Sequence, residues 1–247
     1  MVNARSFLLA AAVTTVAVAA PLEQPRAAGC ASGVYMIVAR GSGEPVGQGK
    51  PGNVAALVAQ RVPGSASVAV DYPASILKRD EELEGRNVEP RVLYPVSVSD
   101  GITDTKKKVQ DYVAKCGNAS KIALIGFSQG GNVITDMLVG GVLKPAPIDD
   151  KYLKNIIAVT VFGDPTFAPN QTYDRGSNAH GQHGGLFSRS GNAGEIAKLN
   201  AMADKLASYC DTDDIVCAGG SSTAVHSAEV DTHAQDAADF IVARAKK

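Results

Sequence analysis

Residues 122–139 read IALIGFSQGGNVITDMLV, and this stretch decides the fold. The apolar run Ile122–Ile125 is typical of a buried strand, and a helical pattern follows over residues 131–139. Between them, residues 126–130 match G-x-S-x-G, a sharp turn from strand to helix that exposes Ser128. A simple Gly-Ser turn that caps a helix is the alternative. The strand before the motif and the helix after it favour a serine nucleophile.

Strand-like and helical patterns alternate along the chain on both sides of this turn. Strands are predicted at Val34–Ala39, Ser67–Tyr72, Ile122–Ile125, Ile156–Phe162 and Leu206–Tyr209. Helices are predicted at residues 52–61, 101–116 and 131–139 and from a capping box at Thr232 to the end. The alternation predicts one α/β domain, with a central, mostly parallel five-stranded sheet and helices on both faces. Residues 78–91 and 168–195 show neither pattern, and we expect exposed loops there.

The composition is that of a soluble globular protein. The chain has 247 residues, of which 45% are apolar and 20% charged, and its formal net charge is -1. These values exclude disordered, collagen-like and disulfide-knot classes, and without a basic cluster we expect no nucleic-acid partner. The Gly-rich motifs of nucleotide-binding loops also fail after the first strand, because Val46 and Glu44 stand where glycines are required. We expect a monomer.

The N-terminus has the features of a secretory signal peptide. Arg5 precedes an uncharged run from Phe7 to Ala20. A membrane span needs about 20 apolar residues, so this shorter run does not predict an anchor. We expect a signal peptide over residues 1–20, a short pro-segment over 21–29 and a secreted domain over 30–247, without stable membrane insertion.

Four cysteines in an exported chain predict two disulfides, for which three pairings are possible. Cys30 and Cys116 each precede an apolar strand-like run by a few residues, so we expect both at the N-terminal edge of a parallel sheet. Cys210 and Cys217 bracket a short loop. We therefore predict the pairs Cys30–Cys116 and Cys210–Cys217, of which the second would stiffen the loop between its sulfur atoms.

A serine nucleophile needs a base, and four histidines are available. His180 and His183 precede the favoured acid, against the order serine, acid, histidine that is expected on this fold. His233 opens the last predicted helix, where we expect it to face solvent. His226 lies in the expected loop between Cys217 and that helix, and it is the predicted base.

Two aspartates compete for the acid that orients the histidine. Asp164 lies in a Gly-Asp-Pro turn after the fourth predicted strand, where an aspartate commonly bonds its own backbone. Asp214 lies in the loop that the second predicted disulfide would hold rigid, and a rigid mount suits an orienting group. We favour Asp214 and keep Asp211 and Asp213 as nearby alternatives.

An acyl-transfer site also needs hydrogen-bond donors for a developing oxyanion. The backbone N–H of Gln129, directly after the serine, is one candidate. Ser42, in the Gly-rich loop after the first strand, offers another backbone N–H and a hydroxyl. This chemistry requires no metal or organic cofactor. A metal hydrolase that uses His180 and His183 is a weaker alternative, because no clear carboxylate ligand pattern accompanies them.

These residues resemble the cutinases and the related acetylxylan esterases over nearly the whole mature chain. The resemblance rests on Ala39–Ser42, Tyr72–Ala74, Gly126–Gly131, Phe162–Pro165 and the segment Tyr209–Cys217. The last of these matches C-x3-D-x2-C and is far more specific than the serine motif. The family pattern implies a small α/β-hydrolase fold without a lid and two disulfides paired as above. It also implies that Ser128, Asp214 and His226 are nucleophile, acid and base, with Ser42 and Gln129 in the oxyanion hole.

The residues and the resemblance together predict a secreted serine esterase. We expect a cutinase-like hydrolase of esters with short to medium acyl chains, acting on a cutin-like polyester, a lipid or an acetylated polysaccharide. Leu186, Phe187 and Val225 are apolar candidates for the rim of its site. One alternative is an acetylxylan esterase that deacetylates plant polysaccharide. Another is a non-catalytic secreted binding protein, in which Glu229, at a position where the family often has Tyr, would misplace His226.

Overall fold

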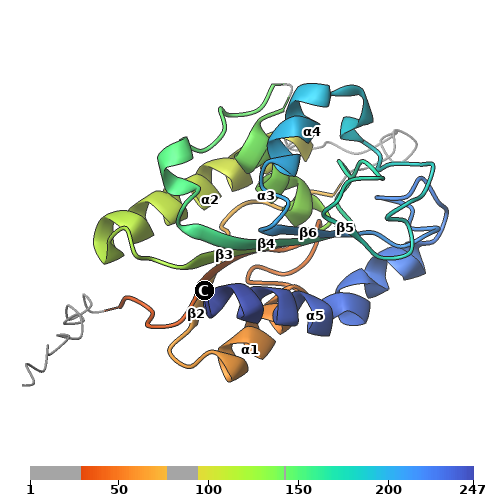
Figure 1. Cartoon of the computed structure of the whole chain (residues 1–247). Helices are drawn as coiled ribbons and strands as arrows, with labels where there is room; N and C mark the ends of the chain where they lie inside the picture. The colour runs from red at the N-terminus through yellow and green to blue at the C-terminus, as the bar shows by residue number, and fades with distance from the viewer. Residues whose placement is uncertain (1–28, 77–93, 142) are drawn as a thin grey trace, which may run out of the picture.

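The computed structural model describes residues 29–76, 94–141 and 143–247. The predicted signal peptide, residues 21–28 of the pro-segment and the expected loop 78–91 lie outside the described residues. The described chain forms one sheet in the order β2-β1-β3-β4-β6-β5, in which every neighbouring pair of strands is parallel. Helices cover both faces of this sheet (Figure 1). The predicted α/β architecture is therefore confirmed.

The sheet has six strands, one more than predicted. They are β1 (Tyr35–Ala39), β2 (Ala66–Ala69), β3 (Ile122–Phe127), β4 (Ile156–Phe162), β5 (Asp174–Arg175) and β6 (Leu206–Tyr209). The five predicted strands are all present. The additional strand β5 pairs with β6 at the edge of the sheet. Two residues are too few to give an alternating pattern, so β5 cannot be distinguished from a loop in the sequence.

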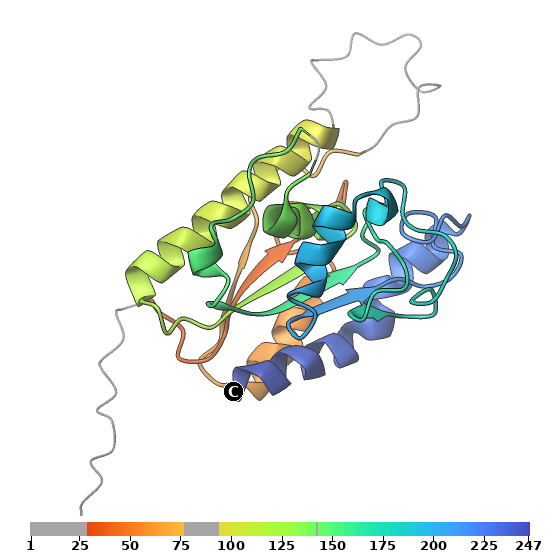
Figure 2. The ribbon, with the colours of Figure 1, turned by 45° about the horizontal axis from the view of Figure 1, so that its top comes forward.

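The described helices lie in two layers (Figures 1 and 2). On one face are α2 (Tyr94–Cys116), α3 (Gln129–Val139) and α4 (Ala193–Asn200), and on the other are α1 (Gly52–Arg61) and α5 (Thr223–Ala245). Two short 3-10 helices, η2 (Asp150–Tyr152) and η3 (Arg189–Gly191), lie in the connections. Within the described ranges, no helix is long and apolar enough to cross a membrane.

Helix α2 begins earlier than predicted. The segment 168–195, for which an exposed loop was expected, contains regular structure. α2 begins at Tyr94 rather than at Gly101, with Pro95 in its first turn, where a missing N–H is tolerated. The segment 168–195 contains β5, η3 and the start of α4, which is capped by the side chain of Asn192. Polar capping residues rather than apolar periodicity therefore organise this part of the chain.

The last helix also begins earlier than predicted, and this change affects the candidate site. α5 begins at Thr223 rather than at Thr232. The side chain of Ser222 caps it by accepting a hydrogen bond from the backbone N–H of Val225. His226 therefore lies in the first turns of a helix and not in a loop.

The sheet divides the core into two apolar clusters. On β1, Ile37 and Ala39 belong to the cluster under α2 and α3, whereas Met36 and Val38 belong to the cluster under α1 and α5. These four side chains are fully buried. Because both faces of a parallel sheet are covered, ligands bind beyond the carboxyl ends of its strands. The loops that carry the predicted site residues follow those ends.

The structure joins Cys30 to Cys116 and Cys210 to Cys217, the pairing that the spacing predicts. The first bridge ties the N-terminal segment to the end of α2 over 86 residues, and the second closes a loop of seven. In the chain-entropy treatment the first stabilises by roughly 4 to 5 kcal/mol and the second by about half as much. The short bridge therefore matters more for the shape of its loop than for global stability.

Candidate active site

Ser128 stands in a strained turn at the carboxyl end of β3, in the middle of the sheet. Its backbone has φ 55° and ψ -119°, a conformation that residues other than glycine rarely adopt. The turn is in close contact with the end of β1, because a Cβ on Gly130 would come within 2.1 Å of the carbonyl oxygen of Ala39. Ser128 is half-buried and immediately precedes α3, whose positive end faces any negative charge that develops there.

His226 faces Ser128 from the first turns of α5. Its Nε2 lies 2.9 Å from the hydroxyl oxygen of Ser128. The ring stacks on Phe127, with 5.0 Å between centroids. Gly163, at φ 57°, leaves the space that the ring needs, because a Cβ there would come within 2.7 Å of the imidazole. The prediction selected the histidine that contacts the serine, but placed it in the wrong kind of element.

Asp214 bonds the other nitrogen of this imidazole. One carboxylate oxygen lies 2.9 Å from Nδ1 of His226. The other accepts hydrogen bonds from the backbone N–H groups of Val216 and Cys217, at 2.6 and 2.9 Å. Burial opposes ionisation of Asp214, but its bonds to His226 and to these amides outweigh burial and hold its pKa below the ordinary value. The carboxylate is therefore charged and fixed.

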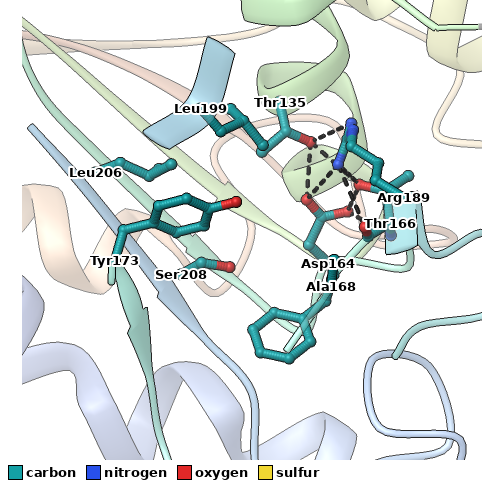
Figure 3. Close-up of a pocket in the computed structure, with 10 residues that line it drawn as sticks. Thr135, Asp164, Thr166, Ala168, Tyr173, Arg189, Leu199, Leu206 and Ser208 are labelled. Atoms are coloured by element: carbon teal, nitrogen blue, oxygen red, sulfur yellow. Dashed lines mark hydrogen bonds and ion pairs between the residues drawn. The ribbon is translucent and has the colours of Figure 1, made fainter. Parts of the chain in front are cut away.

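Asp164, the rival acid, belongs to a different cluster beneath α3 (Figure 3). Its carboxylate accepts hydrogen bonds from the hydroxyl of Thr135 at 2.8 Å and from the backbone and hydroxyl of Thr166 at 2.8 and 2.5 Å. The guanidinium of Arg189 lies 3.7 Å away. Both oxygens of Asp164 are engaged, and neither bonds to a histidine in the described structure.

The two remaining acid candidates also have other partners. A carboxylate oxygen of Asp211 lies 2.8 Å from Nε2 of His233. Asp213 accepts a hydrogen bond from the backbone just before α5. His233 is thus half-buried and paired, where solvent exposure was expected. Among the four aspartates considered, and within the described residues, Asp214 is the one that bonds His226.

The predicted oxyanion donors lie on adjacent segments, and their N–H groups have no acceptor among the described residues. Gln129 is the first residue of α3, and in the described part of the chain its backbone N–H has no acceptor. The same holds for the backbone N–H and the hydroxyl of Ser42. The side chain of Gln129 is anchored by Ser97 and by the carbonyl of Ser75, at 2.9 and 3.0 Å. Contact between Gly130 and the end of β1 brings the two segments together.

His180 and His183 lie apart from this arrangement. Both are exposed. Neither belongs to a group of three or more potential metal ligands within the ranges that the structure describes. The structure thus adds no carboxylate partners to the alternative of a metal site at these two histidines.

Glu229 is a buried acid that the sequence marks only by its departure from the family pattern. It follows His226 by three residues on α5 and is fully buried. One of its oxygens accepts a hydrogen bond from the backbone N–H of Asp211 at 2.6 Å. Burial, together with the neighbouring charges of Asp211 and Asp214, raises the pKa of Glu229 to about 9. No sequence motif signals a carboxyl inside the protein at this position.

A hollow of about 410 Å³ opens beside the exposed side chain of Phe187. The rings of Tyr94 and Phe187 lie 5.6 Å apart on its wall. The lining also includes Pro95 and Leu143, together with polar side chains such as those of Asn132, Asp136 and Lys144. Burial raises the pKa of Asp136 to about 6, although a neighbouring arginine opposes the shift. The hollow thus combines two aromatic rings with hydrogen-bonding groups.

Comparison with known proteins identifies the family of the chain. The family model described as Cutinase matches residues 30–245. "Acetylxylan esterase 2" of Talaromyces purpureogenus is 28% identical over 91% of this chain and 92% of its own length. "Cutinase 11" of Verticillium dahliae is 27% identical over 96% of this chain and 75% of its own length.

A solved structure is similar over the same extent. The catalytic core domain of the acetyl xylan esterase from Trichoderma reesei superposes with a TM-score of 0.72 and 25% identity. The match covers 87% of this chain and 99% of that one. On the family match and these relatives, the chain belongs to the cutinase family and is a carboxylic ester hydrolase.

Proposed function

We propose that the chain is a secreted serine esterase that cleaves carboxylic esters at Ser128. One observation carries the proposal, namely the continuous series of contacts from Ser128 through His226 to Asp214, with 2.9 Å at each step. These distances are within the range for a base that takes a proton from serine and for an acid that orients the base. Two disulfides and the predicted signal peptide support an extracellular location.

In the first half of the reaction, the oxygen of Ser128 attacks the ester carbonyl carbon while Nε2 of His226 takes the serine proton. The carbonyl oxygen becomes an oxyanion, to which the free N–H groups of Gln129 and Ser42 donate. His226 then gives its proton to the leaving alkoxide, and the C–O bond breaks. An alcohol departs, and the acyl group remains on Ser128.

In the second half, water attacks the acyl carbonyl as His226 takes one of its protons. Return of that proton to Ser128 releases the carboxylic acid and restores the enzyme. Asp214 stays ionised throughout, because its partners hold its pKa low. Its negative charge stabilises the imidazolium that forms in each half of the cycle.

Exposed apolar side chains near the loops of the proposed site residues favour an acyl chain of modest length. Ile76 is exposed and lies against Gly43 in the loop of the oxyanion donor Ser42. Leu186 is also exposed, and its backbone N–H donates to the carbonyl of Val216 in the Asp214 loop. Each buried CH₂ contributes about 0.8 kcal/mol, and a shallow groove covers few of them. We therefore expect a preference for acyl chains of about four to eight carbons.

Deacetylation of a polysaccharide is the second candidate. The hollow beside Phe187 favours it, because an aromatic wall with amide, carboxyl and amine groups suits a sugar unit. Two of the similar proteins are named as acetylxylan esterases. In this case the acyl group would be acetyl, and the alcohol side would supply most of the binding.

Replacement of the nucleophile tests the reaction type. Ser128→Ala is expected to fold as the wild type does and to lose about 10⁶ in kcat on a p-nitrophenyl ester. A fluorophosphonate probe should label the wild type at Ser128 and leave the variant unlabelled. If folded wild-type protein resists the probe, the chain is a binding protein on this fold, and the proposal is wrong.

A substrate series separates the two candidates. Hydrolysis rates would be measured on p-nitrophenyl esters from acetyl to palmitoyl, beside acetylated xylan and cutin. A maximum at intermediate chain length supports the cutinase-like activity. A strict acetyl preference with release of acetate from xylan would replace it with polysaccharide deacetylation.

A further inference from the structure

Three potential metal ligands converge behind the loop that carries Asp214. They are Asp211, Glu229 and His233, whose donor atoms all lie within 4.8 Å of one another. Glu229 and His233 are four residues apart on α5 and share one face of the helix. Asp211 comes from the loop after β6, next to the Cys210–Cys217 bridge. The group therefore joins two elements that also hold the acid and the base of the proposed mechanism.

Glu229 directs an oxygen without a partner into this group. Its Oε1 accepts the hydrogen bond from Asp211, but its Oε2, also buried, has no hydrogen-bond partner among the described residues. That oxygen lies 4.0 Å from Nε2 of His233, which in turn is 2.8 Å from Oδ2 of Asp211. Buried polar atoms without partners are rare in folded proteins. This oxygen of a buried acid, beside an imidazole nitrogen and a second carboxylate, lies where a ligand of a cation would lie.

The charge of the group requires a positive partner. Asp211, Asp214 and Glu229 place three carboxyl groups close together, and Asp214 is occupied by His226. In the described chain, no lysine or arginine forms an ion pair with Asp211 or Glu229. The positive charge that balances the group must therefore be a proton or a metal ion.

The donor types and the access to solvent suit a metal. Zn²⁺ binds imidazole nitrogen and carboxylate oxygen at about 2.0 to 2.2 Å, usually with four ligands. The side chains of Asp211 and His233 are 20% and 18% exposed, so an ion could enter and keep a water as its fourth ligand. Cys210 and Cys217 are near Glu229 but are joined to each other, so they offer no thiolate.

We propose that Asp211, Glu229 and His233 form a binding site for a divalent transition-metal ion, Zn²⁺ above all, that ties α5 to the loop carrying Asp214. The ion has a structural role, because the serine mechanism does not use a metal. It acts as a second clamp on this loop beside the Cys210–Cys217 bridge. The proposal extends beyond ester hydrolysis and does not depend on the identity of the ester.

Zinc binding to the protein tests the site directly. The purified protein is stripped with EDTA, dialysed, and titrated with Zn²⁺ in a calorimeter and in thermal unfolding. The expected result is one ion per chain and a rise in Tm of roughly 5 °C or more at a Zn²⁺ concentration about 100 times Kd. If the wild type shows neither binding nor a rise in Tm, the group is balanced by a proton, and the proposal is wrong.

Matched variants locate the ion. Glu229→Gln keeps the oxygen that accepts a hydrogen bond from Asp211 but removes the negatively charged ligand. His233→Gln removes the imidazole ligand. Both variants should lose the zinc-dependent rise in Tm. His226→Gln removes the imidazole that bonds Asp214, outside the proposed zinc site, and should retain the zinc-dependent rise in Tm. Loss of the rise in His226→Gln, with retention in Glu229→Gln, would place zinc on the reacting residues and overturn the proposal.

A spectroscopic measurement covers the case in which the first two variants fail to fold. X-ray absorption of zinc-loaded His226→Gln protein should show one imidazole among oxygen ligands at about 2.0 to 2.2 Å, without sulfur. A coordination shell of oxygen alone would contradict the assignment of His233.

Discussion

Asp164 and Asp214 follow neighbouring strands, β4 and β6, and both carboxylates are buried, at 1% and 0% exposure. Their partners differ. Asp164 accepts from two threonine hydroxyls and lies near Arg189, whose charge is permanent. Asp214 accepts from two backbone amides and from His226, whose charge can change during a reaction.

By this comparison, burial alone does not separate a structural carboxylate from the one that we propose orients His226. All the acceptor capacity of Asp164 is used inside the protein, and its cluster locks the 188–195 segment to α3 through Arg189 and Asp136. Asp214 has one oxygen fixed by amides and the other directed at an imidazole. The partner side chain, and whether it can gain and lose a proton, decides the role.

The largest expected effect comes from exchanging the two carboxylates for amides. Asp214→Asn should lower kcat by about 10⁴, because an amide cannot stabilise the imidazolium and can favour the wrong tautomer of His226. Asp164→Asn should keep kcat within about tenfold of the wild type and instead lower Tm. Both variants would be measured on one p-nitrophenyl ester and by thermal unfolding. An inactive Asp164→Asn beside an active Asp214→Asn would reverse the two roles.

A smaller effect is expected from removing the permanent cation on the Asp164 side. Arg189→Met leaves Asp136 and Asp164 buried without their guanidinium, so the free energy of unfolding at pH 8 should fall by about 3 kcal/mol. The loss should be smaller at pH 5. The pKa of Asp136 is about 6, so its carboxyl is protonated at pH 5 and no longer needs the positive charge of Arg189.

Urea denaturation measures this loss, and Arg61 provides the control. Arg61 pairs with Asp239 at the surface, so Arg61→Met should change the free energy of unfolding by no more than about 0.5 kcal/mol. Equal losses in Arg189→Met and Arg61→Met would show that the buried cluster contributes no more than a surface ion pair.

The smallest effect concerns Asp174, a third buried aspartate, at the β5 edge. It accepts one hydrogen bond from the backbone of Gln171, and its other oxygen has no partner in the described structure. Burial raises its pKa to about 7. The folded state thus binds the proton more tightly than the unfolded state, whose pKa is about 4. This contribution to stability is complete below about pH 4 and is lost as pH rises through 7.

Asp174→Asn should remove that pH dependence. From pH 5 to 8, the free energy of unfolding of the wild type should fall by about 2 to 3 kcal/mol more than that of the variant. Urea denaturation at each pH gives both curves. If the two curves are parallel, Asp174 is solvated in the folded protein, and its pKa is not raised by burial.

Strongly apolar segments could be predicted from the sequence with accurate ends. β4 begins and ends at the predicted residues, because a nearly continuous apolar run defines a strand that is buried on both faces. The weaker pattern of β6 also has the predicted ends. The turn at Ser128 can be predicted equally well. Its two glycines lie too close to neighbouring backbone to carry a side chain, and a strand before the motif with a helix after it is the arrangement that the motif requires. Of the residues that contact one another at the candidate site, Ser128 follows from this local pattern. His226 follows from the order expected on this fold and from the exclusion of the other histidines, and Asp214 from its disulfide-closed loop and the family pattern.

The start of α5 could not be predicted, because a tertiary contact replaces the usual apolar pattern there. Glu229 occupies a buried position on the helix, where periodicity requires an apolar residue. Thr232 and Gln235 also form a capping box in the sequence, although both lie inside the helix. α4 lacked a signal for a related reason, since Leu199 is its one fully covered residue.

The sequence distance between Ser128 and His226, 98 residues, also sets the order in which the site is made. At about 5 to 20 residues per second, a ribosome adds the histidine roughly 5 to 20 seconds after the serine. Until then the growing chain has the proposed nucleophile without its proposed base, and α5, which covers one face of the sheet, does not exist. Under the proposed mechanism, hydrolytic activity therefore requires a chain that has been made at least as far as His226. A copy that stops before His226 would then be inert towards the esters of the cell that makes it.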